Sequence, residues 1–239
     1  MKTLMIMLML IIGYTSKSEA SGVLDLKDFD LMNEIYDYFS QTTVHSYSKN
    51  SCSLIGNDTH NIKQNFKRAA DSLLEVNRWG KIIGIPGQKY KIYGPSKKAL
   101  NYKVLQDDLI EISFSMDPTL RTYWVKVERI VKGNDFVEVV VRPTANPRLP
   151  YKKSVTDHFF TNESINSLKV KIEGSRLVVS VKGENEKTNI TQGRSKADIM
   201  ANAIITQMAW GIQQNDEAKV GIQRLNWYLL TQNLAKCDL

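Results

Sequence analysis

The spacing between apolar residues changes twice along this chain, and this change constrains the fold more than any other feature. Between residues 79 and 182, apolar side chains recur at about every second position, which is typical of β-strands. Before that stretch, in residues 26–39 and 61–77, and again after Thr191, they recur at every third or fourth position, which is typical of helices. The sequence therefore predicts an α+β fold in which a run of strands lies between helices.

Seven strands are predicted in the middle stretch. They span residues 79–85, 89–93, 109–114, 122–131, 136–142, 167–172 and 176–182. Several connections are short and rich in glycine or asparagine, as in residues 132–135 and 173–175, and such residues suit tight turns. Because parallel strands need long crossover connections, we expect these strands to pair antiparallel. The polar residues 40–60 are interpreted as a loop.

The helical spacing after Thr191 predicts helices that pack against the sheet. One helical face contains Ala197, Met200, Ala203, Ile204, Met208 and Ile212, and a final helix carries Val220, Leu225, Tyr228, Leu229 and Leu234. The polar residues 214–219 divide these two helices. We expect an antiparallel sheet, able to curl, that packs against N-terminal and long C-terminal helices in a single domain of residues 21–239.

The first 20 residues have the order of a signal peptide. Lys2 is followed by the apolar residues 4–12 and a short polar segment, and the small residues Ser18 and Ala20 lie where a signal peptidase reads the chain. This predicts removal of residues 1–20 and a secreted or periplasmic protein. The alternative is a membrane anchor, but the apolar stretch is shorter than the roughly 20 residues that span a bilayer as a helix. No later stretch is as apolar, so no membrane span is predicted after the signal peptide.

Two cysteines, Cys52 and Cys237, remain after removal of the signal peptide. An even number of cysteines in an oxidising compartment favours a disulfide bond, which would join the C-terminus to the N-terminal part of the chain. Closing so long a loop would stabilise the fold by about 5 kcal/mol in the chain-entropy model. The alternative interpretation is two free thiols, which would be alkylated without prior reduction.

The formal net charge of +7 favours acidic partners in general but does not indicate a nucleic-acid surface. The only adjacent lysine pairs, Lys97-Lys98 and Lys152-Lys153, are not embedded in basic runs with interleaved aromatic residues. Surfaces that bind nucleic acid normally gather their charge on one face. We therefore expect no nucleic-acid partner, and we interpret the charge as a solvated surface.

Three side chains are candidates for catalysis, namely Glu184, Glu186 and His158. Glu184 and Glu186 are two residues apart, so in a regular extended chain they would point to the same side. Two such carboxylates could supply the acid and the base of glycoside hydrolysis; the alternative is a solvated strand end, given the neighbouring lysines. Asp157 could orient the imidazole of His158, but neighbours on a strand point to opposite faces. The alternative is a histidine that is hydrogen-bonded inside the fold.

Other catalytic and cofactor motifs are missing from the sequence. The three histidines, His45, His60 and His158, do not have the spacing of metal ligands, and no serine lies in a Gly-x-Ser-x-Gly elbow. No glycine-rich segment matches a phosphate-binding loop. We therefore predict no cofactor and no metal ion.

Several segments together resemble a family of exported bacterial proteins, chiefly of the Bacteroidetes type. These segments are residues 69–79, 124–128, 142–143, 146–147, 158–160 and 183–186. The resemblance covers most of residues 69–186 and brings no activity and no catalytic residue to this chain.

The order of elements is also similar to the helix-grip fold of START-type lipid-binding proteins. In that fold a curved antiparallel sheet wraps a long C-terminal helix around an apolar cavity. Two differences stand out, because two predicted helices precede all predicted strands here, and the C-terminal segment is divided near residues 214–219.

Abundant apolar and aromatic residues, together with the missing catalytic motifs, favour binding over catalysis. The leading hypothesis is a secreted protein that holds an apolar or amphipathic small molecule, or a lipid, between its sheet and its C-terminal helices. The first alternative is a hydrolase acting on cell-surface glycans or esters. The second is an envelope interaction protein that recognises acidic surfaces through its positive charge.

Overall fold

The computed structural model of the chain describes residues 43–53, 59–94, 99–100, 102–114, 121–149, 156–190 and 222–237, and within the last gap residues 199, 202–203, 205–206, 213–214 and 217–218. The predicted signal peptide 1–20 and the predicted helix 26–39 lie outside the described residues. So does most of the predicted helical face between residues 197 and 212, although residues 202–203 and 205–206 are helical.

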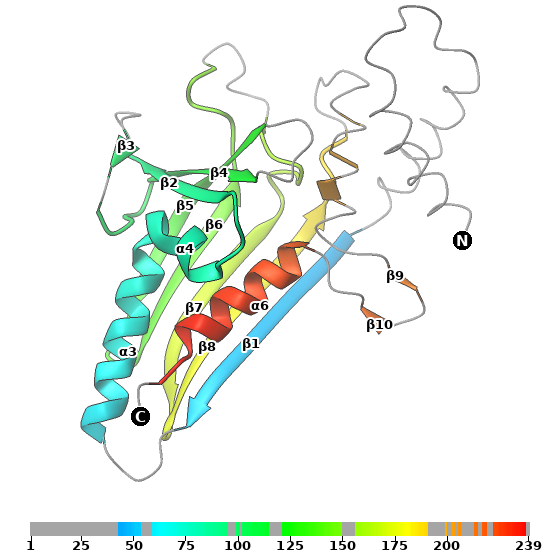
Figure 1. The fold of residues 1–239 in the computed structure, drawn as a ribbon. Helices are drawn as coiled ribbons and strands as arrows, with labels where there is room; N and C mark the ends of the chain where they lie inside the picture. The colour runs from blue at the N-terminus through cyan, green and yellow to red at the C-terminus, as the bar shows by residue number, and fades with distance from the viewer. Residues whose placement is uncertain are drawn as a thin grey trace, which may run out of the picture.

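An antiparallel sheet of eight strands forms the frame of the described structure (Figure 1). From edge to edge it contains β1 (Thr43–Ser53), β8 (Arg176–Lys187), β7 (Ile165–Glu173), β6 (Phe136–Pro143), β5 (Thr122–Lys132), β4 (Leu109–Phe114), β2 (Gln88–Tyr93) and β3 (Ala99–Leu100). All neighbouring pairs are antiparallel, as the short connections predict. A separate pair, β9 (Gln213–Gln214) and β10 (Glu217–Ala218), lies where the sequence divides the C-terminal helices.

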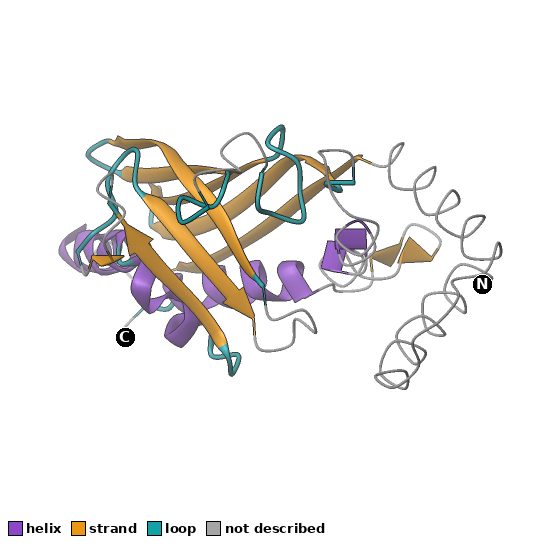
Figure 2. Cartoon of the chain, turned by 90° about the horizontal axis from the view of Figure 1, so that it is seen from above, coloured by secondary structure: helices purple, strands orange, loops and turns teal. Residues whose placement is uncertain are grey.

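Helices cover one face of this sheet. The helix α3 (Thr59–Leu74) packs against β6, β7 and β8, and α6 (Ile222–Leu234) packs against β1 and β8. Between α3 and β2, the 3-10 turn η1 (Val76–Arg78) leads into the short helix α4 (Trp79–Ile83), which contacts α6. Seen from above, the strands curve around the helices, and we call the covered face the concave face (Figure 2). The predicted α+β class is confirmed.

Six of the seven predicted strands are confirmed, as β2 and β4 to β8, but the strand predicted at residues 79–85 is wrong. Residues 79–83 form α4 instead. Trp79 Nε1 donates to the carbonyl oxygen of Leu73 at 3.1 Å, and Gly84, with a φ of 78°, ends the helix in the left-handed conformation. Trp79 and Ile83 are four residues apart and both buried, so their spacing fits one helical turn.

The loop predicted at residues 40–60 is wrong for its central part, which forms β1. No apolar alternation marks this strand, because the side chains that it turns towards α6 are polar. Ser48 Oγ lies 2.9 Å from Thr231 Oγ1, and Asn50 Nδ2 donates to Thr231 Oγ1 at 2.7 Å and to the Tyr228 carbonyl at 3.3 Å. A strand therefore precedes the described helices, which removes one of the two differences from the helix-grip order of elements.

The final predicted helix is confirmed as α6, but its buried face differs from the predicted one. Leu225 and Tyr228 are 38% and 47% exposed. The buried side chains of α6 include Asn226, Leu230, Thr231 and Leu234. The polar members of this face meet polar partners on the sheet, since Asn226 Oδ1 accepts a hydrogen bond from Gln88 Nε2 at 2.8 Å. The orientation of α6 is therefore set by polar as well as apolar side chains of the sheet, and not by the apolar residues of the helix alone.

Apolar side chains fill the part of the concave face beneath α3 and α6, which we call the proximal end. Members from both layers are at most 4% exposed, and they include Leu73 and Leu74 of α3, Leu230 and Leu234 of α6, and Val139, Leu168, Val170, Leu177 and Val179 of the sheet. Full burial of such a side chain contributes roughly 1.5–3 kcal/mol. The proximal end is thus a packed core.

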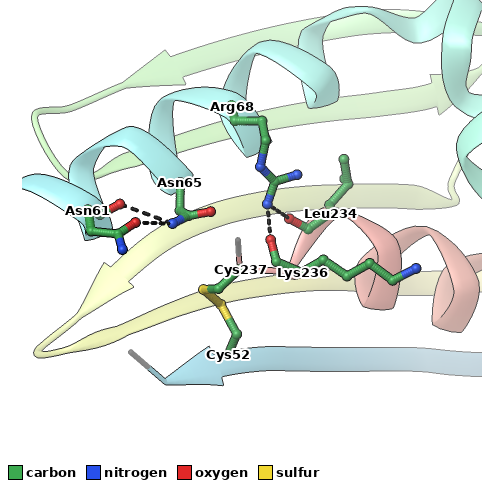
Figure 3. Close-up of a disulfide and its surroundings, with 7 residues drawn as sticks. All are labelled: Cys52, Asn61, Asn65, Arg68, Leu234, Lys236 and Cys237. Atoms are coloured by element: carbon green, nitrogen blue, oxygen red, sulfur yellow. Dashed lines mark hydrogen bonds between the residues drawn. A yellow bond between two sulfur atoms is a disulfide. The ribbon is translucent and has the colours of Figure 1, made fainter. Parts of the chain in front are cut away.

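The C-terminal end of α6 is fastened to the proximal end by covalent and polar contacts (Figure 3). Cys237 forms the predicted disulfide with Cys52 of β1, with the two Cα atoms 6.0 Å apart. Arg68 of α3 donates to the carbonyl oxygens of Leu234, at 3.4 Å, and of Lys236. The carbonyls at a helix end have no partner within the helix, so the guanidinium caps α6.

Candidate functional site

A β-bulge near the end of β8 separates the two candidate glutamates. Asn185 has a φ of 54°, and the pairing of β8 with β1 shifts at this point, between Val44 and Ser46. Glu186 consequently turns to the concave face and is fully buried, whereas the Glu184 side chain is 43% exposed and pairs with Lys182 at 2.7 Å. The prediction that both carboxylates point to the same side is wrong, because strict alternation holds only in a regular strand.

The exposed glutamate has the electrostatics of a surface group. The ammonium of Lys182 hydrogen-bonds to Glu184 and lowers the pKa of its carboxyl group. A general acid needs a raised pKa to keep its proton near neutral pH. Glu184 therefore lacks the protonation behaviour that the acid of a glycoside hydrolase requires.

Gly183 makes room for the buried glutamate. It pairs with Ser46 of β1 on one side and with Asn166 of β7 on the other. The Glu186 carboxyl group lies over Gly183, where a β-carbon would collide with it and with the Ser46 hydroxyl. Ser46 Oγ donates to Glu186 Oε1 at 3.0 Å. A row of polar groups thus crosses three strands on the concave face.

Asn166 is the member of this row whose hydrogen bonding is incomplete. Its side chain is 7% exposed, and its Oδ1 atom has no hydrogen-bond partner in the part of the chain that the structure describes. Leaving such a group unsatisfied costs roughly 1–3 kcal/mol. Buried polar atoms of this kind call for a ligand, a water molecule or another partner.

Aromatic rings form the other side of this region. Phe114 of β4 contacts Tyr123 of β5 at 5.9 Å between ring centroids, and Tyr123 contacts Phe159 at 5.1 Å and His158 at 5.7 Å. His158 also stacks on Phe159 at 4.3 Å. We call the whole region the distal end of the concave face. It consists of Ser46, Phe114, Tyr123, His158, Phe159, Asn166, Gly183 and Glu186.

The structure confirms the alternative interpretation of His158 as a histidine hydrogen-bonded inside the fold. Its Nδ1 atom accepts a hydrogen bond from the backbone N–H of Phe160 at 3.0 Å, so Nδ1 carries no proton there. The carboxylate of Asp157 does not orient this imidazole, since Asp157 Oδ2 accepts from Asn146 Nδ2 at 3.1 Å. Phe160 in turn forms an isolated β-bridge with Thr188, just after β8.

A polar network that sequence reasoning missed holds the aromatic segment in place. Asn189 Nδ2 donates to the carbonyl oxygens of Thr156 and His158, both at 3.0 Å. The helical residue Asn202 donates to the Asn189 carbonyl at 2.7 Å and accepts from Arg121 at 3.1 Å. The helical residues Asn202 and Thr206 therefore lie against the distal end. The only sequence signal for it was the asparagine within an otherwise apolar helical pattern.

The proline-rich segment that follows β6 packs, in its described residues 144–149, on the face of the sheet opposite to the helices. Arg148 binds both carboxylate oxygens of Glu111 at 2.8 and 3.0 Å, and its guanidinium lies over the rings of Tyr93 and Trp124 at 5.0 and 5.2 Å. Glu111, Tyr93 and Trp124 alternate with core residues of their strands and so face away from the helices. Residues 144–149 therefore pack on the face of the sheet that the helices leave uncovered, which we call the convex face.

Several lysines on the convex face form ion pairs with glutamates. Lys49 and Lys171 both contact Glu173, as Lys182 contacts Glu184. The neighbouring ammonium groups, Lys171 first, lower the pKa of the Glu173 carboxyl group. This pattern agrees with the interpretation of the charge as a solvated surface.

Neither a metal centre nor a transmembrane helix is found among the described residues. No group of three or more histidine, cysteine, aspartate or glutamate side chains in this part of the chain could hold a metal ion. No helix in it has the length and apolarity needed to cross a bilayer.

Comparison with known proteins leaves the family of this chain open. No protein-family model and no curated protein matches it. Among solved structures, a hypothetical protein from Helicobacter pylori is 11% identical over 66% of this chain and 73% of its own, with a TM-score of 0.38. Norcoclaurine synthase from Thalictrum flavum is 10% identical over 78% and 91%, with a TM-score of 0.36. The major latex-like protein 151 from Panax ginseng is 12% identical over 67% and 93%, with a TM-score of 0.35. These TM-scores are below 0.5, so neither a family nor a function is inferred from the similarities.

Proposed function

We propose that this protein binds an amphipathic small molecule at the distal end of the concave face. The observation that carries the proposal is Asn166, whose buried Oδ1 atom lacks a hydrogen-bond partner among the described residues. It lies beside the buried pair of Ser46 and Glu186 on a face whose core side chains are mainly apolar. Pockets for small molecules combine such apolar walls with a few convergent polar groups.

The two sides of the distal end match the two parts of an amphipathic ligand. Phe114 and Tyr123 supply aromatic surface from β4 and β5, and Ile112 packs beside them against the core. Ser46, Asn166 and Glu186 supply polar atoms from β1, β7 and β8. A ligand lying across these strands would bury its apolar body against the rings and place its polar group near β7.

The proximal end is occupied by the protein itself. Leu73 of α3 and Leu230 of α6 are fully buried against the sheet side chains there. The binding site that we propose is therefore at the distal end only, rather than along the full length between sheet and C-terminal helices.

We further propose that the protein works outside the cytoplasm, as the order of residues 1–20 predicts. The disulfide between Cys52 and Cys237 supports this proposal, because such bonds persist in oxidising compartments. The hydrolase and the acidic-surface hypotheses gain no support from the geometry of Glu184, Glu186 and His158 or from the paired lysines.

Binding of a fluorescent apolar probe, N-phenyl-1-naphthylamine, tests the proposed site. Phe114→Lys introduces a charge into the aromatic side of the site and is expected to weaken binding about tenfold or more, since burying a charge without a partner is costly. The matched control is Ser113→Lys. Ser113 is the neighbour of Phe114 on β4, so its side chain points to the opposite face of the sheet.

Organic extracts of the purified protein, analysed by mass spectrometry, provide an independent test. We expect a copurifying apolar or amphipathic compound in the native protein and its depletion in Phe114→Lys. Failure of the native protein to bind the probe, or equal binding by the two lysine variants, would contradict the proposed site.

A further inference from the structure

We propose that residues 26–39 form a helix that docks on the exposed side of α6, beside the edge strand β1. The segment lies outside the described residues, and its apolar residues have helical spacing, namely Leu26, Phe29, Met32, Ile35, Tyr36 and Phe39. A helix of this length is only marginally stable in water by itself, so its apolar stripe needs a partner surface. This contact does not depend on the proposed ligand site.

α6 presents two large exposed apolar side chains to such a partner. Leu225 and Tyr228 are 38% and 47% exposed, and their spacing of three places them on one side of the helix. This side is turned away from the sheet, because Leu230 and Leu234, on the other side of α6, belong to the core. Single exposed apolar residues are common on protein surfaces, so the place of this pair, rather than its size, is what marks it.

The beginning of β1 brings residues 26–39 close to this pair. β1 and α6 lie side by side (Figure 1). They run in the same direction, since Asn50 of β1 donates to the Tyr228 carbonyl and the disulfide joins residues further along both segments. The N-terminal half of α6 is therefore directed towards the start of β1. Only residues 40–42 separate the predicted helix from β1, which begins at Thr43.

The length of the segment fits this placement. A helix over these 14 residues is about 21 Å long. From Thr43 to Asn50, which contacts Tyr228, β1 extends for roughly 23 Å. A helix folded back along β1 therefore reaches the level of Tyr228. It would also cover the outer edge of β1, where backbone groups face away from β8.

The other large exposed apolar side chains among the described residues lie elsewhere. Tyr102 and Leu105 precede β4 near the opposite edge of the sheet, and Val131 is on β5, in the middle of the sheet. Tyr47 precedes Ser48, which contacts α6, so Tyr47 turns to the convex face. The pair on α6 is therefore the exposed apolar surface that lies on the helical side of the sheet and beside β1.

The charge of the segment favours this protein over a membrane as its partner. One lysine and four acidic residues lie in it, namely Lys27, Asp28, Asp30, Glu34 and Asp37. Helices that lie on a membrane surface are instead rich in lysine and arginine, which anionic lipids attract. The whole chain carries a net charge of +7, so the remainder is strongly basic and attracts an acidic segment.

Hydrogen–deuterium exchange of the purified protein, with residues 21–42 present, tests this contact. We expect slow exchange of the backbone amides of residues 26–39, because a docked helix protects its hydrogen bonds. Leu225→Glu and Tyr228→Glu each place a charge against the apolar stripe and should speed this exchange by about tenfold or more, since burying an unpartnered charge is costly. Leu105→Glu, at an exposed leucine near the other edge of the sheet, is the control and should leave the exchange unchanged.

A variant of the segment tests the contact from the other side. Phe29→Glu should speed the exchange of residues 26–39 as the α6 variants do, because it interrupts the same stripe. The amides of the sheet should remain protected in all of these variants, since the substituted positions on α6 are exposed and Phe29 precedes β1. Faster exchange confined to residues 26–39 then reports undocking and not unfolding.

Three results would overturn the proposal. The first is exchange of residues 26–39 at the rate of an unstructured peptide in the native protein, and the second is equal exchange in the Leu225→Glu and Leu105→Glu proteins. The third is protection that comes from another partner. Protection that rises with protein concentration would identify a second copy of the chain, and protection that requires added phosphatidylglycerol vesicles would identify a lipid surface.

Discussion

The two ends of the concave face are built from the same strands but from different kinds of side chain. On β7, Leu168 and Asn166 are two residues apart and point to the same face, and both are buried. Leu168 belongs to the packed core under the helices, whereas Asn166 carries an oxygen without a partner among the described residues. Two residues of one strand thus mark the change from a core to a polar region.

This difference indicates that stability and binding are separated along the sheet. The proximal end has apolar packing, the cap of Arg68 and the disulfide, all of which hold α3, α6 and β1 together. The distal end has buried polar groups, which lower stability unless a partner satisfies them. Proteins commonly retain such destabilising groups where function requires them.

The largest expected effect is the loss of the disulfide. Replacing Cys52 and Cys237 together by serine should lower the free energy of unfolding by up to about 5 kcal/mol, because the unfolded chain regains the freedom of a very long loop. Urea denaturation measures the change, and the native protein under reducing conditions should match the double variant. Probe binding below the transition should persist, and its loss would show that the two ends are not separate.

Core packing should give the next largest effect. Leu168→Ala removes a side chain that is 1% exposed and leaves a cavity at the proximal end. The expected loss is about 2–5 kcal/mol, again measured by urea denaturation. A loss below 1 kcal/mol would mean that the proximal end is loosely packed, and the distinction between the two ends would then fail.

Much of the fold could be predicted from the sequence because the sheet is apolar on one face. The strands β4 to β8 carry alternating apolar residues that are buried in the core, and glycine-rich turns join several of them. β1 could not be predicted in this way. Its buried face consists of Ser46, Ser48, Asn50 and Cys52, which pair with groups more than 130 residues away in sequence.

The candidate site was predicted less well, and for a local reason. The bulge at Asn185 adds one residue to β8, and a single added residue exchanges the faces of all side chains beyond it. The sequence therefore predicts that Glu186 points to the same side as Glu184, whereas in the structure Glu186 points to the concave face and accepts a hydrogen bond from Ser46. An asparagine after a glycine and a glutamate is compatible with a left-handed residue, but nothing in the sequence required one at that position.

Gly183→Ala tests how closely the polar row is fitted to the sheet. The added methyl group would collide with the Glu186 carboxyl and the Ser46 hydroxyl, so the free energy of unfolding should fall by about 1–3 kcal/mol. Combining it with Ser46→Ala removes one of the two obstacles, and the double variant should be less destabilised than the sum of the single variants. Additive losses would show that the Ser46 hydroxyl does not limit the space at Gly183.

Asn166→Leu should have a smaller effect of the opposite sign. Replacing an unsatisfied buried amide by an apolar group of similar size should leave stability unchanged or raise it by roughly 1 kcal/mol in the ligand-free protein. Leu168→Ala, two residues along the same strand, should instead lower stability, so the two variants compare the two ends of the concave face directly. A clear loss of stability would mean that the Asn166 amide is satisfied in solution.

The smallest expected effect concerns the surface of α3, the helix that covers the proximal end. Asp71 accepts from Lys103 Nζ at 2.6 Å and from Lys67 Nζ at 2.9 Å, and these ammonium groups, Lys103 first, lower the pKa of the Asp71 carboxyl group. A lowered pKa in the folded state stabilises the fold above the ordinary value near 4, and the contribution disappears as the pH falls through the folded pKa.

Asp71→Asn should therefore cost less than about 1 kcal/mol at neutral pH, because the ion pairs are partly exposed and screened. The difference from the native protein, followed by thermal unfolding, should shrink as the pH falls below 4 and vanish once the carboxyl group is protonated in both states. Lys63→Gln, at an exposed position on the same helix without a described ion pair, serves as the control. If Asp71→Asn instead costs as much as Leu168→Ala, charge rather than apolar packing holds α3 on the sheet, and the contrast between a proximal end stabilised by its apolar core and a polar distal end fails.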